Sequence, residues 1–140
     1  MSYALSAALQ AAVFQQITGD PTVTAAVGSD VFDAVPSGQV PSLYVALGPE
    51  RVRDASDKSG GGALHEFTVS VVTDAAGFAT AKGVAGAVSD ALIDAPLTLS
   101  RGRLIGLRFV RATAAQTSKG KIRRIDLIFR ARVADDTPTP

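Results

Sequence analysis

The stretch that decides the fold runs from Leu64 to Leu92 and reads LHEFTVSVVTDAAGFATAKGVAGAVSDAL. In its first part, Phe67, Val69 and Val71 fall on one side of an extended chain, and polar residues fall between them. This alternation is typical of a strand with one buried face. We therefore predict a strand over residues 64–73.

The second part of this stretch has the periodicity of a helix. We predict a helix over residues 75–94, with Asp74 as its N-cap and Pro96 preventing its continuation. A strand and a helix that follow each other directly can pack together through their apolar faces, and the rest of the chain then packs against this unit. The apolar residues recur at spacings of three and four, which places them on one helix face: Phe78, Ala81, Ala85, Val88 and Leu92.

The chain before this unit contains two further helical segments and two strand segments. An uncharged amphipathic helix is expected over residues 2–18, ended by Gly19 in a left-handed conformation. Asp20 is placed to cap a short helical turn that ends near Val27. The remaining segments are a short edge strand at residues 31–32 and a strand over residues 43–53.

The chain after this unit predicts a second hairpin, formed by residues 103–115 and 121–133. If Ala115 faces Lys121, every inward pair is apolar, which favours that register. The predicted inward pairs are Phe109 with Leu127, Leu107 with Phe129, and Ile105 with Ala131. The opposite face then carries Arg108, Arg124, Arg130 and Arg132, together with Asp126.

These segments predict the α+β class, with a mostly antiparallel sheet of about four strands and two main helices packed on one side. We expect a single domain over residues 1–134 and a flexible C-terminal tail over residues 135–140. A chain of 140 residues can bury roughly 68–70% of its unfolded surface, so it needs no metal or disulfide to fold. It contains no cysteine, which excludes a disulfide scaffold and a thiolate metal site.

Charge is segregated along the sequence. Residues 1–100 hold four Lys and Arg against ten Asp and Glu, whereas residues 101–140 hold ten against three. The first nineteen residues have no basic segment of the kind that begins a signal peptide, and glutamines interrupt their apolar run. We therefore expect a protein made inside the cell, without a membrane partner.

A polar, glycine-rich segment lies between the two central strands. We expect it to be a long, mobile hairpin loop, because it has almost nothing to bury. A loop of this kind can order against a neighbouring protein. Its residues of interest are Asp54, Asp57, Lys58, Ser59, Gly60, Gly61 and Gly62.

No constellation predicts catalysis, metal binding or a cofactor. His65 is the only histidine, and its neighbours lack the spacing of a metal site or a catalytic triad, so a surface or rim position is expected. Lys58 precedes the three glycines instead of following them, which is the reverse of a phosphate-binding loop. We predict no catalytic, metal-binding or cofactor-binding residues and no enzyme activity.

Of all features of the sequence, the basic hairpin gives the clearest indication of a function. Its arginines could form an ordinary solvated strand face, or a surface that meets a polyanion or an acidic partner. No aromatic residue alternates with them, so any contact with DNA would involve the backbone and depend on salt. A small nucleic-acid-binding α+β module is therefore the alternative function.

Several segments resemble the tail terminator, or tail completion, proteins of long-tailed phages, and in particular the version found in gene transfer agents of alphaproteobacteria. The likeness extends over about residues 2–133. It is carried by residues 1–10 (MSYALSAALQ), 33–36 (DAVP), 41–45 (PSLYV), 48–54 (GPERVRD) and 65–67 (HEF), and by the basic hairpin with RIDL at 124–127.

This resemblance implies a structural protein that forms a hexameric ring on the head-proximal end of a tail tube. The ring would end tube polymerisation, join the tail to a head connector or stopper protein, and let DNA pass through its lumen. Its partners would be other copies of itself, the tail tube protein, the connector and, transiently, DNA. Within that assembly, we expect the hairpin loop to contact neighbouring rings and the four arginines to face the lumen or a partner.

Overall fold

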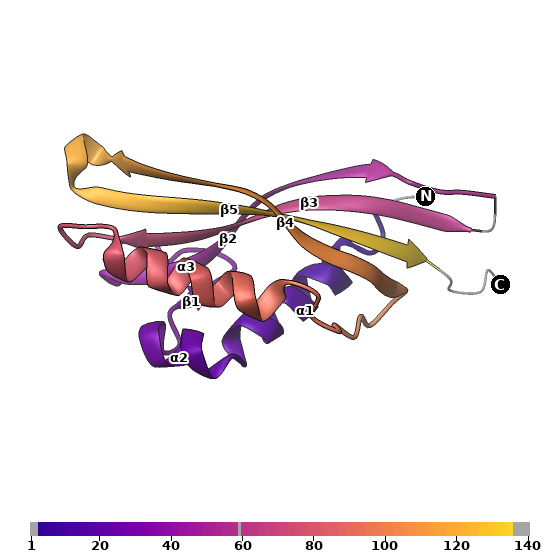
Figure 1. Cartoon of the computed structure of the whole chain (residues 1–140), viewed down its shortest axis with the longest axis horizontal. Helices are drawn as coiled ribbons and strands as arrows, with labels where there is room; N and C mark the ends of the chain where they lie inside the picture. Colours follow the sequence, from indigo (N-terminus) through magenta and orange to yellow (C-terminus); the bar gives the residue numbers. More distant parts are fainter. Residues whose placement is uncertain (1–2, 59, 136–140) are drawn as a thin grey trace.

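In the part of the chain that the computed structural model describes, residues 3–58 and 60–135, a five-stranded sheet carries three α-helices on one of its faces (Figure 1). This arrangement confirms the predicted α+β class. The elements in chain order are α1 (Ser6–Thr18), α2 (Pro21–Val27), β1 (Val31–Phe32), β2 (Leu43–Asp54), β3 (Gly61–Thr73), α3 (Ala79–Leu92), β4 (Arg103–Thr117), the 3-10 turn η1 (Ser118–Gly120) and β5 (Ile122–Asp135).

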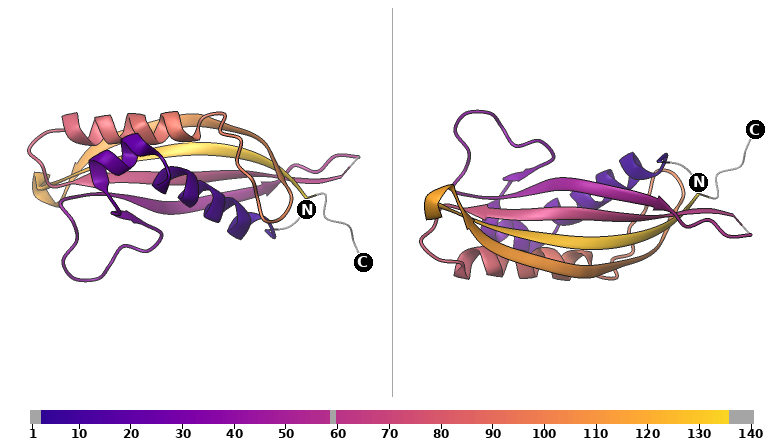
Figure 2. Two further views of the ribbon diagram at one scale, coloured as in Figure 1. Left: turned by 90° about the horizontal axis from the view of Figure 1, so that it is seen from below. Right: turned by 90° about the horizontal axis from the view of Figure 1, so that it is seen from above.

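The sheet has the strand order β1-β2-β3-β5-β4. β1 runs parallel to β2, and the other neighbouring strands are antiparallel. The predicted edge strand at residues 31–32 is confirmed, and it supplies the fifth strand beyond the roughly four expected. The long strands β4 and β2 therefore lie toward opposite sides of the sheet, with β3 and β5 at its centre (Figure 2).

The core lies between the helices and the inward face of the sheet. Val69 and Val71 of β3 are fully buried there, as the alternation of their segment predicted. Phe129 of β5 is also fully buried and stacks on Phe67 with ring centroids 5.7 Å apart. Helix α1 contributes Leu9 to the same cluster. The helices and the two central strands thus share one continuous apolar interior.

Helix α3 begins later than predicted, at Ala79 instead of residue 75, and its N-cap is Phe78 without a side-chain hydrogen bond. Asp74 is therefore not the cap. The four residues before the helix are held in other ways: the Ala75 N–H donates to Thr73 Oγ1 at 3.1 Å, and Arg123 donates to the Ala75 carbonyl at 2.8 Å. A helix that began at residue 75 would need the Ala75 carbonyl as an acceptor for the Ala79 N–H, and Arg123 already donates to this carbonyl.

The N-terminal helices end where predicted, but α1 begins at Ser6 instead of residue 2, and the junction between the two helices also differs. Asp20 accepts a hydrogen bond from the Val23 N–H at 3.0 Å, which confirms it as the N-cap of α2. Gly19, however, has φ −86°, so its predicted left-handed conformation is wrong. Its N–H donates to the Gln15 carbonyl, and the helical bonding of α1 therefore continues up to the residue that caps α2.

The predicted register of the β4–β5 hairpin is wrong. Phe109 faces Phe129 and Leu107 faces Ala131, whereas Leu127 faces Ala112. The turn closes between Thr117 and Ile122, and two bulges in β4 then shift the pairing further along the hairpin. Two large apolar side chains of β4 that were predicted to point inward are exposed, Ile105 by 50% and Phe109 by 41%.

The loop between β2 and β3 is shorter than the ten residues expected. Asp54 pairs with Ala63 as the last rung of the β2–β3 ladder, and Gly61 and Gly62 pair with the end of β5. Gly62 is required there, because a Cβ atom on it would lie 2.9 Å from the Ala55 carbonyl oxygen. The connection therefore spans residues 55–60, and Ser59 lies outside the described residues.

At the C-terminus the strand extends one residue beyond the predicted domain boundary. Asp135 ends β5, pairs with Gly61 and forms an ion pair with Arg101 at 2.7 Å. The rest of the predicted flexible tail lies outside the described residues.

Candidate interaction surface

The face of the sheet that points away from the helices, called here the outer face, carries the four arginines singled out in the sequence. Along β5, Arg124, Arg130 and Arg132 alternate with buried residues such as Leu127 and Phe129. Arg108 of β4 lies directly opposite Arg130. The structure therefore brings all four onto one surface.

Four more arginines lie on the same face, and the sequence reading missed them. The register places Arg51 beside Glu66 and Arg53 beside Leu64, both outward positions of β3. Arg103 and Arg111 occupy outward positions of β4. The alternation of the two arginines in β2 could have revealed them, but the bulge between Leu47 and Glu50 reverses the inward pattern read from the start of that strand.

Two carboxylates pair with part of this surface. Arg130 Nη2 lies 3.0 Å from Glu66 Oε2, and Arg111 Nη1 lies 3.9 Å from Glu66 Oε1. The hydrogen bond from Arg130 is the main reason why the pKa of Glu66 lies below its ordinary value. Arg124 Nε donates to Asp126 Oδ1 at 2.8 Å, within a small network that also contains Ser70. In the part of the chain that the structure describes, these two carboxylates pair with three arginines of the outer face, Arg111, Arg124 and Arg130.

Four arginines of the outer face line a depression in the surface. A hollow of about 450 Å³, called here the arginine hollow, has Arg53, Leu64, Asp94, Arg108, Arg130 and Arg132 among its lining residues. An adjoining hollow of about 390 Å³ shares Arg53, Leu64 and Arg130 with it. Among the described residues, Arg53, Arg108 and Arg132 form no ion pair, and Arg132 only approaches the Ala55 carbonyl at 3.5 Å. The hollow therefore has a surplus of positive charge.

The β2–β3 hairpin projects beyond the helices at one end of the molecule (Figure 2). In its loop, Asp57 and Gly60 form an isolated bridge, and the Gly60 N–H donates to Asp57 Oδ1 at 3.1 Å. At its base, Ser56 donates to Asp54 at 2.7 Å. Lys58 is exposed at the tip, so the predicted contact segment lies at the extremity of the sheet.

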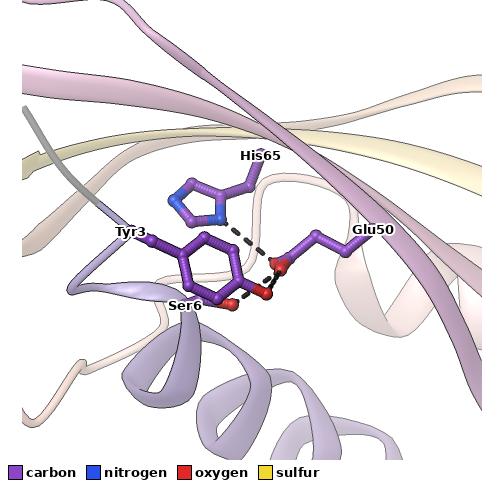
Figure 3. Close-up of polar contacts among 4 residues, drawn as sticks. All are labelled: Tyr3, Ser6, Glu50 and His65. Atoms are coloured by element: carbon purple, nitrogen blue, oxygen red, sulfur yellow. Dashed lines mark hydrogen bonds and ion pairs between the residues drawn. The ribbon is translucent and has the colours of Figure 1, made fainter.

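A buried polar cluster lies on the other side of the sheet and was not predicted (Figure 3). Glu50 accepts hydrogen bonds from Ser6 at 2.7 Å and from Tyr3 at 2.5 Å, and its second oxygen lies 3.2 Å from His65 Nδ1. His65 has 0% exposure, so the expected surface or rim position is wrong. The pairing of β2 with β3 explains the burial of His65, because it places His65 opposite Val52 on the inward side of the sheet.

The cluster ties the start of α1 to the sheet. Burial alone would raise the pKa of Glu50, but the hydrogen bonds from Ser6, Tyr3 and His65 outweigh it and leave the pKa below its ordinary value. His65 Nε2 is buried without a hydrogen-bond partner among the described residues. The proton of the neutral ring therefore belongs on Nδ1, where Glu50 accepts it.

This geometry does not reproduce a catalytic triad. In a triad the serine hydroxyl bonds to the histidine, whereas Ser6 donates to the carboxylate. His65 is fully buried, and its Nδ1 atom also faces the carboxylate of Glu50, not the hydroxyl of Ser6. The described residues also contain no group of three or more His, Cys, Asp or Glu that could hold a metal ion. None of the described helices is long and apolar enough to cross a membrane.

Comparison with known proteins shows which family the chain belongs to. No curated protein matches the chain. A solved structure described as "Virion of native gene transfer agent (GTA) particle" contains a chain that is 62% identical, with a TM-score of 0.90, over 95% of this chain and 99% of that chain. The family described as "Tail completion protein gp17" matches residues 11–134. The chain belongs to this family of tail completion proteins.

Proposed function

We propose that this protein is a structural component of the tail of a phage-like particle, specifically of a gene transfer agent. The observation that carries this proposal is the 62% identity, over nearly the whole of both chains, to a chain of the gene transfer agent virion. The two chains also share their fold over that length, with a TM-score of 0.90. We assign the protein no catalytic role.

Within the tail, the protein forms a hexameric ring that caps the head-proximal end of the tube. Its sheet has two open edges that suit a ring of identical subunits: β4, and the part of β2 beyond the two residues that pair with β1. Because β4 and β2 lie on opposite borders, each copy offers one edge to each neighbour, a head-to-tail contact that can close into a ring. The ring ends tube polymerisation and joins the tail to the head connector.

The surfaces described above have separate roles in this assembly. The loop at the tip of the β2–β3 hairpin contacts a neighbouring ring, either the tube or the connector. The outer face, with Arg108, Arg124, Arg130 and Arg132, faces the lumen through which DNA passes or a partner protein. Its surplus positive charge supports either position, because both DNA and acidic protein surfaces are complementary to it.

Deleting the gene in a producing strain and imaging the particles by electron microscopy tests this function. Loss of a tube terminator should give tails of variable, excessive length and heads without attached tails. Supplying the wild-type gene on a plasmid should restore tails of uniform length. Normal, head-attached tails in the deletion strain would refute the proposed role.

A nucleic-acid-binding module remains the second candidate, favoured by the eight arginines of the outer face. That function predicts salt-dependent binding of free DNA or RNA by the isolated protein. A filter-binding titration at two salt concentrations separates the two functions. Tight binding that weakens steeply with salt would favour the module, and weak binding at both concentrations would favour the structural role.

A further inference from the structure

The arginine hollow contains cations that the rest of the described chain does not neutralise. Arg53, Arg108 and Arg132 have no carboxylate partner there, and Arg130 shares its partner Glu66 with Arg111. Asp94 is the single acidic residue among the lining residues of the hollow. Among the described residues, the four guanidinium groups of the hollow therefore meet only Asp94 in its lining and Glu66, which Arg130 shares with Arg111.

Two of these arginines face each other directly. Arg108 of β4 lies opposite Arg130 of β5 in the ladder, and like charges at such positions destabilise a sheet. An anion bound between them would turn this repulsion into an attraction. Glu66 neutralises Arg130 from the β3 side, so Arg108 is the member of the pair that an anion from outside the chain would neutralise.

The cations are all arginines, and this choice narrows the chemistry of the ligand. The planar guanidinium forms two parallel hydrogen bonds with a carboxylate or a phosphate, which the lysine ammonium cannot do. On the same face, Arg130 and Arg124 already bind carboxylates, those of Glu66 and Asp126. The ligand is therefore a carboxylate or a phosphate.

Three observations favour carboxylates of a protein over phosphates of a nucleic acid. Glu66 and Asp126 lie on the same face, so a continuous line of phosphates crossing it would meet two negative charges. None of the lining residues is aromatic, so bases have no stacking surface. If DNA also moves past this face, as in the proposed function, phosphate contacts repeated in each copy would hold it back.

The shape of the hollow indicates an extended segment. Arg130 and Arg132 are two residues apart on the same side of β5, about 7 Å along the strand, which equals the spacing of alternate side chains in a second strand. The hollow also borders Gly106 and Arg108 of β4, so it extends across neighbouring strands of the outer face.

We propose that the arginine hollow binds an extended acidic segment of another protein, with carboxylates at alternate positions. This inference rests on the proposed function only for the argument about DNA passage. The binding partner in the particle would be a protein of the ring above or below, which inserts this segment over the outer face.

The test uses the purified full-length protein and fluorescence anisotropy. The probes are a labelled peptide of alternating glutamate and threonine, a peptide of the same composition with its glutamates in one block, and a labelled DNA duplex of similar length. At about 150 mM salt we expect the alternating peptide to bind more tightly than the block peptide and the duplex. Tighter binding of the duplex would overturn the proposal and favour nucleic acid. Failure to bind the alternating peptide would also overturn it.

Three variants locate the site. Arg108→Gln and Arg132→Gln should each weaken binding of the alternating peptide about tenfold, as expected when one bidentate contact is lost. Both side chains are exposed, so circular dichroism should show an intact fold. Lys82→Gln, on α3 in the other layer, removes the same charge and should leave binding within about twofold. Equal losses in all three variants would refute a specific site. Because no particle is needed, a negative result here leaves the deletion experiment unaffected.

Discussion

Removing the Glu50 carboxylate should destabilise the protein by an amount that depends on what replaces it. In Glu50→Ala, the Ser6 hydroxyl and the His65 ring N–H lose their acceptor while both residues remain buried. An unsatisfied buried polar group costs about 1–3 kcal/mol, so the two together predict a loss of about 2–6 kcal/mol in the free energy of unfolding. In Glu50→Gln, the amide oxygen can accept from His65 and the amide nitrogen can donate to Ser6. The hydrogen bonds remain but lose the extra strength that a charged acceptor gives them, so the free energy of unfolding should fall by about 1–2 kcal/mol.

Urea unfolding followed by circular dichroism at pH 7 measures these losses. Tyr3→Phe is the matched control, because the Tyr3 side chain is 64% exposed and water replaces its hydrogen bond to Glu50, so the loss should stay below about 1 kcal/mol. The expected order of stability is wild type, Tyr3→Phe, Glu50→Gln and Glu50→Ala. Equal losses for the alanine and glutamine variants, or an alanine variant as stable as wild type, would refute this account of the cluster.

The same cluster makes stability depend on pH. The pKa of Glu50 is lowered by folding, so its contribution is complete above the pKa of the unfolded chain and disappears as the pH falls through the folded pKa. Wild type should therefore lose more stability than Glu50→Gln as the pH falls from about 5 to about 3, below the ordinary pKa of a glutamate. Parallel losses in the two proteins would show that Glu50 does not supply this pH dependence.

Three further predictions concern packing, backbone conformation and capping. Phe129→Ala removes a fully buried ring that contacts Phe67 and Phe109, and it should cost about 3–5 kcal/mol in urea unfolding; a loss below about 1 kcal/mol would contradict the packing described. Gly102→Ala should destabilise the protein, because Gly102 has φ +68° and a Cβ atom would lie 2.6 Å from the Ala134 carbonyl oxygen. Gly83→Ala should instead stabilise the protein by up to about 1 kcal/mol, because Gly83 lies within α3 and a Cβ atom there would meet open space. The melting temperatures of the two variants should therefore shift in opposite directions from that of the wild type. Asp20→Ala should cost about 1 kcal/mol through loss of the α2 cap, and Asp20→Asn, which keeps the acceptor, should restore most of it.

The sequence predicted the parts of the fold that depend on local burial. The alternation of Phe67, Val69 and Val71 places β3 correctly, because one face of that strand is buried along its length. The Asp20 cap was equally predictable, since capping involves only the next few residues. The register of β4 was not predictable, because it depends on two bulges and on packing between strands.

The candidate surfaces likewise contain some residues that the local sequence pattern places and others that only the pairing of strands places. The arginines of β5 could be placed on one face because their positions alternate with buried residues. Arg53, by contrast, joins them only through the β2 bulge and the pairing of β2 with β3. The contact of Glu50 with His65 and Ser6 also joins three separate segments, and no sequence spacing indicates it. Sites made by a single strand are thus visible in the sequence, whereas sites made across strands require the fold.

Cryo-electron microscopy of the junction between head and tail tests the central claim most directly. We expect one hexameric ring of this protein between the tube and the connector, with an acidic extended segment of a neighbouring protein over Arg108 and Arg132. Density for this protein at another place in the particle, or as single copies without a ring, would contradict the account.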